Sequence, residues 1–303
     1  MILLGIGIRN NGSGSRVTID GKPVTEKIEL KEEFVVDMNT EKKLPNIRSD
    51  YHPTRIYVAD NAIGIASFNG GLRASQEFGV YHPETNSIDF IGSANSSYIW
   101  YYEMAALIGD FMYISHNLTH KVDLINKTVT RINVSTDNIF SFKGELYGNT
   151  RNTDIHKINL NDATKTTICP NLQYWEEPSY ISYETSDALY LIPDYYNDRY
   201  NGARIMKFDG KTATEISGPF GVSNGIFFHP HIVDGKAYVY GREATDDCGY
   251  FNKYLFKDGE FTLVDKVQQP YNGFQEFKGK TYATTIYKKY NFFAEVKKIY
   301  SSK

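Results

Sequence analysis

Short apolar stretches alternate with polar turns along the chain, and residues 226–264 show this pattern most clearly. Four stretches rich in Val, Ile, Tyr and Phe are separated there by two tight turns, Asp234-Gly235 and Asp258-Gly259, and by one longer polar loop. Asp-Gly between alternating apolar runs is a strong hairpin signal, because glycine tolerates the positive φ of primed turns. The segment therefore predicts an antiparallel four-stranded sheet, which needs neighbours because it cannot bury both faces alone.

The same unit recurs along the chain. Its first turn is found at Asp20-Gly21, Asp60-Asn61, Gly109-Asp110, Lys143-Gly144, Ser186-Asp187, Asp234-Gly235 and Lys278-Gly279. Its second turn is found at Asn39-Thr40-Glu41, at residues 83–86, and at Asn126-Lys127, Asn161-Asp162, Asp209-Gly210 and Asp258-Gly259. The spacing is close to the roughly 40 to 50 residues of propeller blades. Seven first turns and six second turns predict seven repeats, the last of which lacks a final strand.

Residues 2–9 form a spare apolar strand that can complete the last repeat. Closure in this way removes the unpaired sheet edges that an open ring would expose. We therefore predict an all-β fold, a seven-bladed β-propeller of four-stranded antiparallel blades, with six blades as the alternative. The predicted single domain spans residues 1–303, with blades at 15–47, 55–92, 103–134, 138–168, 179–217, 226–264, and 273–300 together with 2–9.

Residues 65–86 resemble the kelch repeat of β-propellers. The apolar run Ile65–Phe68 is followed by the glycine pair Gly70-Gly71 and then by the hairpin sequence Tyr81-His82-Pro83-Glu84-Thr85. The glycine pair occurs in no other blade, and the tryptophan usual in the last strand of a kelch blade is absent. The resemblance implies a propeller fold and a preference for binding roles, and it implies no catalytic residue.

Composition and charge exclude several classes of protein. A formal net charge of −3 over 303 residues lacks the basic excess of a nucleic-acid binder. The two cysteines, Cys169 and Cys248, lie in different repeats and do not indicate a disulfide framework. The first eight residues lack a basic region and are too short for a signal sequence or a membrane span. We expect a cytoplasmic protein, or a virion component if the source is viral, without membrane insertion.

The longer connections of every repeat are expected on one side of the disc, where loops on a rigid scaffold carry function. These connections are rich in Tyr, Trp and Arg, the residues enriched at protein interfaces, and aromatic rings also stack on sugars. Packing between blades is the competing explanation for any one ring. The candidate binding residues are Trp100, Tyr101, Tyr102, Tyr174, Trp175, Tyr195, Tyr196, Arg199 and Tyr200.

Histidines are the weaker candidates, because they are scattered over several blades. His116 and His120 belong to one repeat. His229 and His231 are two residues apart on a predicted strand, and because side chains alternate along a strand, both rings should lie on the same face of the sheet. Three histidines with a carboxylate could hold a divalent ion, yet these repeats lie far apart on the ring. We therefore predict no metal and no cofactor. The chain also contains no nucleophile elbow, P-loop or paired CxxC motif, so we predict no catalytic residues and no enzyme.

Two functional hypotheses follow. The first is a non-enzymatic propeller that serves as a protein-interaction or structural scaffold through its long loops, such as a subunit of a phage virion or tail. The alternative is a carbohydrate-binding or carbohydrate-active propeller, a lectin, lyase or hydrolase, that uses the same aromatic loops. Protein neighbours in an assembly are the expected partners under the first hypothesis, and a glycan is the expected partner under the second.

Overall fold

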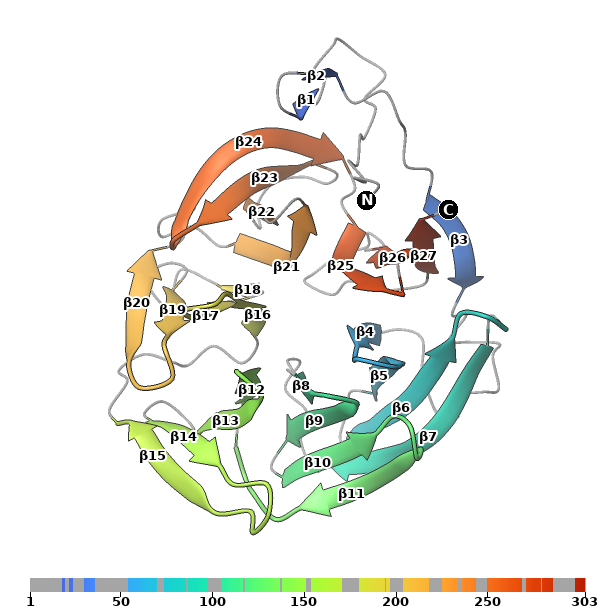
Figure 1. Ribbon diagram of the computed structural model, residues 1–303, viewed down its shortest axis with the longest axis vertical. Helices are drawn as coiled ribbons and strands as arrows, with labels where there is room; N and C mark the ends of the chain where they lie inside the picture. The colour runs from blue at the N-terminus through green and yellow to red at the C-terminus, as the bar shows by residue number, and fades with distance from the viewer. Residues whose placement is uncertain are drawn as a thin grey trace.

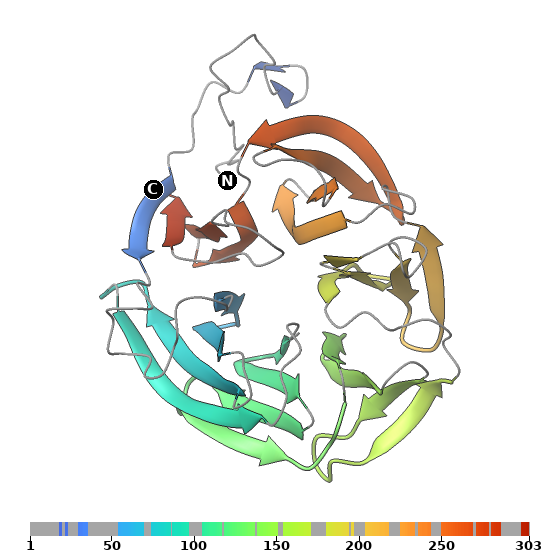
Figure 2. The same cartoon turned by 180° about the vertical axis from the view of Figure 1, so that it is seen from behind.

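The strands form antiparallel sheets that fan around a common centre, as Figure 1 shows from one side and Figure 2 from the other. This computed structural model describes residues 18–19, 22–23, 30–35, 54–69, 74–85, 87–96, 105–116, 118–136, 138–150, 154–170, 180–193, 195–196, 204–217, 225–233, 236–243, 250–268, 271–278, 280–285 and 298–302.

The strands occupy the following residues. They are β1 (Thr18–Ile19), β2 (Lys22–Pro23), β3 (Leu30–Val35), β4 (Thr54–Val58), β5 (Ile63–Asn69), β6 (Ala74–His82), β7 (Ser87–Ser96), β8 (Ala105–Ile108), β9 (Phe111–His116), β10 (Leu118–Asp123), β11 (Thr128–Ile132), β12 (Asn138–Phe142), β13 (Glu145–Thr150), β14 (Asp154–Ile158), β15 (Lys165–Cys169), β16 (Tyr180–Glu184), β17 (Leu189–Pro193), β18 (Tyr195–Tyr196), β19 (Arg204–Phe208), β20 (Ala213–Ser217), β21 (Gly225–Val233), β22 (Lys236–Glu243), β23 (Tyr250–Lys257), β24 (Glu260–Gln268), β25 (Tyr271–Phe277), β26 (Lys280–Thr285) and β27 (Lys298–Ser302).

The described strands pair into larger sheets and one small hairpin. The first sheet is β4–β7, the second is β8–β11 and the third is β12–β15. The fourth sheet contains β16, β17, β19 and β20, and the fifth contains β18 with β21–β24. The sixth sheet contains β25–β27 and β3, while β1 pairs only with β2. The prediction of an all-β fold built from four-stranded antiparallel sheets, the architecture of a β-propeller, is confirmed.

The fourth strand of the last sheet differs from the prediction. β3 lies inside the predicted first blade, residues 15–47, but it pairs antiparallel with β27, with Phe34 opposite Ile299. β3 therefore fills the edge position that the sequence analysis gave to residues 2–9, which lie outside the described residues. A seven-blade ring is not confirmed, because the described part of residues 15–47 supplies only the β1–β2 hairpin and this strand.

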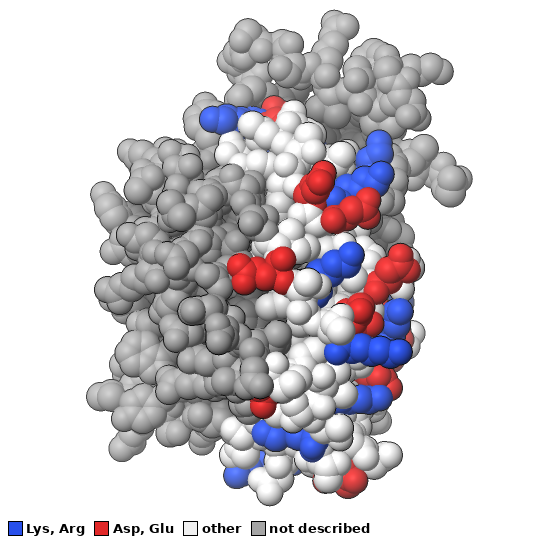
Figure 3. Space-filling model, turned by 90° about the vertical axis from the view of Figure 1, so that its left-hand side faces the viewer, with Lys and Arg blue, Asp and Glu red and all other residues white. Residues whose placement is uncertain are grey.

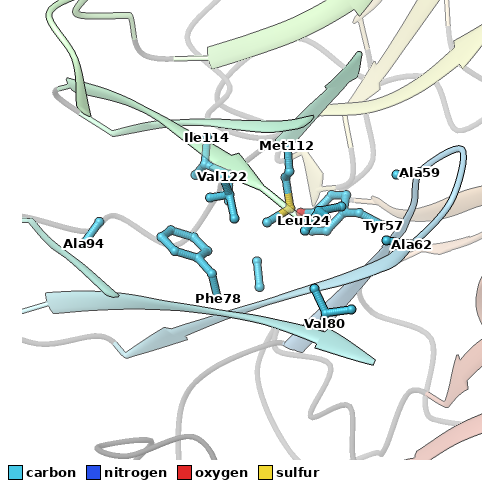
Figure 4. Packing of buried hydrophobic residues seen from close by; sticks show 11 residues of the cluster. Tyr57, Ala59, Ala62, Phe78, Val80, Ala94, Met112, Ile114, Val122 and Leu124 are labelled. Atoms are coloured by element: carbon cyan, nitrogen blue, oxygen red, sulfur yellow. The ribbon is translucent and has the colours of Figure 1, made fainter. Parts of the chain in front are cut away.

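Neighbouring sheets pack through their apolar faces. Phe78 of the first sheet lies against Ile114 and Val122 of the second, in a cluster that includes Met112 and Leu124 (Figure 4). Four of these side chains are fully buried and Leu124 is 1% exposed, and burying a side chain of this size contributes about 1.5–3 kcal/mol. Similar clusters join the second sheet to the third, the third to the fourth and the fourth to the fifth. These layers hold the sheets rigidly and so fix the positions of the connections between them.

Two-residue hairpins occur where the Asp-Gly-like turns predicted them. Lys143 and Gly144 both have positive φ, 51° and 73°, and they join Phe142 to its register partner Glu145. Asp258 and Gly259 repeat this geometry with φ of 53° and 91°. Positive φ at both central residues is the signature of the primed turn that suits the twist of a hairpin. The tight turns of the sequence pattern are therefore confirmed at these positions.

Candidate functional site

The two rims of the molecule differ in their connections. Within each four-stranded meander, the first-to-second and third-to-fourth strand turns lie at one rim, which we call the tight-turn face. The turns Asp60-Asn61 and Lys143-Gly144 belong to this rim. The remaining connections leave from the opposite rim, the long-loop face, where β9 ends at His116 and β12 begins at Asn138. The long-loop face is the candidate functional site.

Tyr195 and Tyr196 are placed at the inner edge of a sheet. A loop was expected for these residues, but they form β18, which pairs antiparallel with Ile226 and Gly225 of β21. β21 is the innermost of the four long strands of its sheet (Figure 1), and β18 pairs with its free edge, opposite to β22. The connection that follows β17 of the fourth sheet is thus hydrogen-bonded to β21, the innermost long strand of the fifth sheet.

The other candidate binding residues fall where the structure gives no description. They are Trp100, Tyr101, Tyr102, Tyr174, Trp175, Arg199 and Tyr200. Their role in binding stays a prediction.

The four candidate histidines are distributed over two sheets. His116 is the last residue of β9. His120 lies on β10, the third strand of its sheet, where its register partners are Ile114 of β9 and Arg131 of β11. His229 and His231 lie in β21, where the register shifts between Phe228 and His231. Pro230 stands in this bulge, as expected for a residue that cannot donate a ladder hydrogen bond. The register shift falls around His229, and the prediction that both rings turn to one face stays untested, because these side chains lie outside the described atoms.

Buried polar atoms without partners collect near the long-loop face. Among the described residues, Thr119 Oγ1 and Asn138 Oδ1 are buried and make no hydrogen bond. Burial lowers the pKa of His120 most, and the nearby Arg131 charge lowers it further, which favours the neutral ring. Such atoms are uncommon in folded proteins and call for a physical explanation at each position. Thr119 and Asn138 could not be identified from the sequence, because one threonine or asparagine in a strand carries no distinctive signal.

The tight-turn face shows the opposite behaviour. Asp209 accepts hydrogen bonds from the backbone N–H groups of Lys211 and Thr212 and from the Thr212 hydroxyl, at 2.7 to 2.9 Å. These bonds lower the pKa of Asp209 to about 2. Asp123 similarly accepts bonds from Ile125 and Asn126, and the bonds from Asn126 are the main reason for its lowered pKa. Local turn geometry accounts for these carboxylates, and nothing about them suggests a ligand.

Metal ligation finds no support in the described part of the chain. No group of three or more His, Cys, Asp or Glu side chains in that part could hold a metal ion. The side chains of His116, His229 and His231 lie outside the described atoms, so these weak candidates are untested. Cys169 is free and buried, and its thiol lies 3.2 Å from the carbonyl oxygen of Lys211.

The outer wall carries charges of both signs. Figure 3 shows Lys and Arg side chains interspersed with Asp and Glu over the described part of one side of the molecule. Among the described residues, no helix is long and apolar enough to cross a membrane.

Comparison with known proteins gives likenesses of low identity. No protein-family model and no curated protein matches the chain. Among solved structures, the chain is similar to the β-propeller domain of the Trilobed protease from Pyrococcus furiosus, with 11% identity, a TM-score of 0.42, and coverage of 79% of this chain and 80% of that one. A protein from Lactobacillus plantarum gives 9% identity, a TM-score of 0.47, and coverage of 77% and 79%. An oligogalacturonate lyase from Vibrio parahaemolyticus gives 12% identity, a TM-score of 0.45, and coverage of 84% and 77%.

These comparisons correct the order of the two functional hypotheses. The non-enzymatic scaffold was placed first, but the similar structures include an oligogalacturonate lyase and a domain of a protease. The scaffold hypothesis, with its virion version, is therefore not carried forward. At such identities and TM-scores, no residue role or substrate passes to this chain from these proteins.

Proposed function

We propose that the chain is a carbohydrate-binding β-propeller that holds its ligand on the long-loop face, close to the centre of the ring. The pairing of β18 with β21 carries this proposal, because it fixes the backbone of Tyr195 and Tyr196 at the inner edge of the fifth sheet. A tyrosine ring combines an apolar face with a polar hydroxyl, which suits a sugar that presents both C–H and O–H groups. A backbone that is ordered before binding also reduces the entropic cost of association.

The residues at the same rim are consistent with a ligand rich in hydroxyl groups. Asn138 and Asn149 are register partners, and the Asn138 backbone N–H donates to Asn149 Oδ1 at 3.1 Å. Asn138 Oδ1 stays unpartnered among the described atoms. Neutral amides can both donate to and accept from sugar hydroxyls.

We further infer a ring of six blades, the alternative count of the sequence analysis, in which β3 completes the last blade. The support is the β3–β27 ladder and the position of Phe277 of the sixth sheet, which packs in one cluster with Ile63 and Tyr81 of the first. This contact brings the end of the ring against its beginning.

The test is a direct binding measurement. Calorimetry should be run on the full chain with three classes of soluble oligosaccharide: neutral glucans, neutral mannans and oligogalacturonates. We expect one class to bind, with at least a tenfold weaker Kd after the combined change Tyr195→Ala and Tyr196→Ala. Phe90→Ala is the control, since Phe90 is 40% exposed on the outer strand β7.

Failure of every class to bind the wild-type chain would overturn the proposal, and so would equal Kd values for the double variant and the wild type. The same samples, analysed by chromatography after incubation, show whether the bound saccharide is also cleaved. Cleavage would extend the proposal from binding to catalysis.

A further inference from the structure

Thr119 is a polar residue in a fully buried position. It is the second residue of β10 and has no exposed surface, and its Oγ1 makes no hydrogen bond with the described residues. Its backbone N–H donates to the carbonyl oxygen of Val134 at 2.8 Å, so only the hydroxyl is unsatisfied. Valine has nearly the same shape and would remove the unsatisfied group. A buried hydroxyl without a partner is costly, which makes threonine an unexpected choice unless something binds it.

Two further hydroxyl-bearing residues, Ser115 and Thr136, lie beside Thr119. Ser115 of β9 is the register partner of Thr119, so the two side chains stand on the same face of the second sheet. On that face Ser115 Oγ contacts the carbonyl oxygen of Thr136 and lies 2.7 Å from Thr136 Oγ1. Ser115 and Thr136 are only 2% and 1% exposed. The three hydroxyl groups therefore form a polar seam, defined by Ser115, Thr119 and Thr136, between the second and third sheets.

The seam retains hydrogen-bonding capacity. Each hydroxyl supplies one donor and two acceptor positions, and the Ser115–Thr136 contacts use only part of them. The third sheet closes tightly against the methyl group of Thr136, because a Cβ added to Gly148 would lie 2.5 Å from Thr136 Cγ2. The free capacity thus remains on the side of Ser115 and Thr119.

We propose that the polar seam binds an ordered water molecule, held by Thr119 Oγ1 and by the hydroxyl groups of Ser115 and Thr136. A water molecule supplies two donors and two acceptors, and a buried water typically makes about three such bonds. It would satisfy the Thr119 hydroxyl and join β10 to the connection that enters the third sheet. The site lies near the long-loop face but does not depend on the proposed carbohydrate ligand.

The first test is the sign of a stability change. Thr119→Val should lower the melting temperature of the full chain by about 2 °C, because it removes a satisfied hydrogen-bonding group. A Thr119 hydroxyl that binds nothing would give the opposite result, since its removal would raise the melting temperature. Thr130→Val is the matched control on the exposed part of β11 and should change the melting temperature little. An unchanged or raised melting temperature for Thr119→Val overturns the proposal.

The second test observes the water directly. A crystal structure of the wild-type chain should show a density peak within hydrogen-bond distance of Thr119 Oγ1 and of Ser115 Oγ or Thr136 Oγ1. The peak should be absent from Thr119→Val crystals grown in the same form. An empty wild-type seam, or a peak that persists in the variant, contradicts the assignment.

Discussion

Asn61 of the first sheet donates two hydrogen bonds to Asp110 of the second. The backbone N–H of Asn61 donates to Asp110 Oδ1 at 2.6 Å, and its side-chain amide donates to Oδ2 at 2.7 Å. Both residues belong to first turns on the tight-turn face, one in each of two neighbouring sheets. A related contact joins the third and fourth sheets, where the Lys143 backbone N–H donates to Glu184 Oε1 at 3.1 Å. Neighbouring sheets are thus linked by turn-to-turn hydrogen bonds as well as by apolar packing.

Loss of the Asp110 carboxylate should remove both hydrogen bonds between the first and second sheets at this point. We expect Asp110→Ala to destabilise the chain by about 1 kcal/mol, because two charge-assisted bonds disappear at an exposed position. Urea unfolding of the variant measures the loss. Asp60→Ala, one residue before Asn61, leaves both bonds in place and serves as the control. Equal destabilisation by the two changes would show that the Asn61–Asp110 hydrogen bonds add nothing to the free energy of unfolding.

Gly148 should tolerate no side chain. An added Cβ would lie 2.9 Å from Thr136 Cβ and 3.0 Å from the Asn138 carbonyl oxygen, and closer still to Thr136 Cγ2. Gly148→Ala should therefore cost about 1–3 kcal/mol through overpacking, as measured by thermal unfolding. Adding Thr136→Ser removes one of the clashing groups and should recover part of the loss. A Gly148→Ala protein as stable as the wild type would refute this close approach.

The Asp209 carboxylate should support stability in acid. Its pKa lies at about 2 in the folded chain, below the ordinary value of 3.8, because of the bonds from Thr212 and Lys211. A lowered folded-state pKa means that the contribution is complete above about pH 4 and is lost as the pH falls toward 2. NMR titration should give the low pKa directly. Asp209→Asn should flatten the acid limb of the stability curve, and an acid limb identical to that of the wild type would contradict this role.

The charged form of Lys253 should destabilise the folded chain relative to the neutral form. Its ammonium nitrogen lies 4.3 Å from the centre of the Tyr238 ring, and its register partner across the strand pair is Asp265. Burial lowers the Lys253 pKa, although the Asp265 charge opposes that shift. The folded-state pKa lies below that of the unfolded chain, so stability should increase as the pH rises through the lowered pKa.

A neutral residue of similar length should remove this cost. We expect Lys253→Met to stabilise the chain by about 1 kcal/mol at neutral pH, with the gain shrinking as the pH approaches 10. Chemical denaturation at several pH values provides the measurement. Lys121→Met is the matched control, because Lys121 lies in a similar position 3.8 Å from the centre of the Phe111 ring. A gain that is independent of pH would contradict the explanation.

Local features of the fold were predictable from the sequence, because they depend on a few adjacent residues. Lys143-Gly144 and Asp258-Gly259 fixed the turn type through the φ values that glycine permits. The destination of β3 was not predictable in this way. An apolar run such as Leu30–Val35 indicates a strand, but its partner β27 is chosen by contacts across almost the whole chain.

The candidate site was less predictable than the fold. The sequence identified Tyr195 and Tyr196 as binding candidates but expected a loop, because a two-residue strand has no periodicity to detect. Pro230 is the sequence signal for the register shift in β21, because proline cannot donate a ladder hydrogen bond. Thr119 gave no warning, since its environment depends on how the second and third sheets meet.

The pairing of β3 with β27 sets an order of events during synthesis. Phe34 can meet Ile299 only after every residue between them has been synthesised, so the sixth sheet acquires its outer strand late. Until then, the edge of β27 is unpaired, and such edges invite pairing with other chains. Newly made protein should therefore be most prone to self-association in the interval just before this final strand docks.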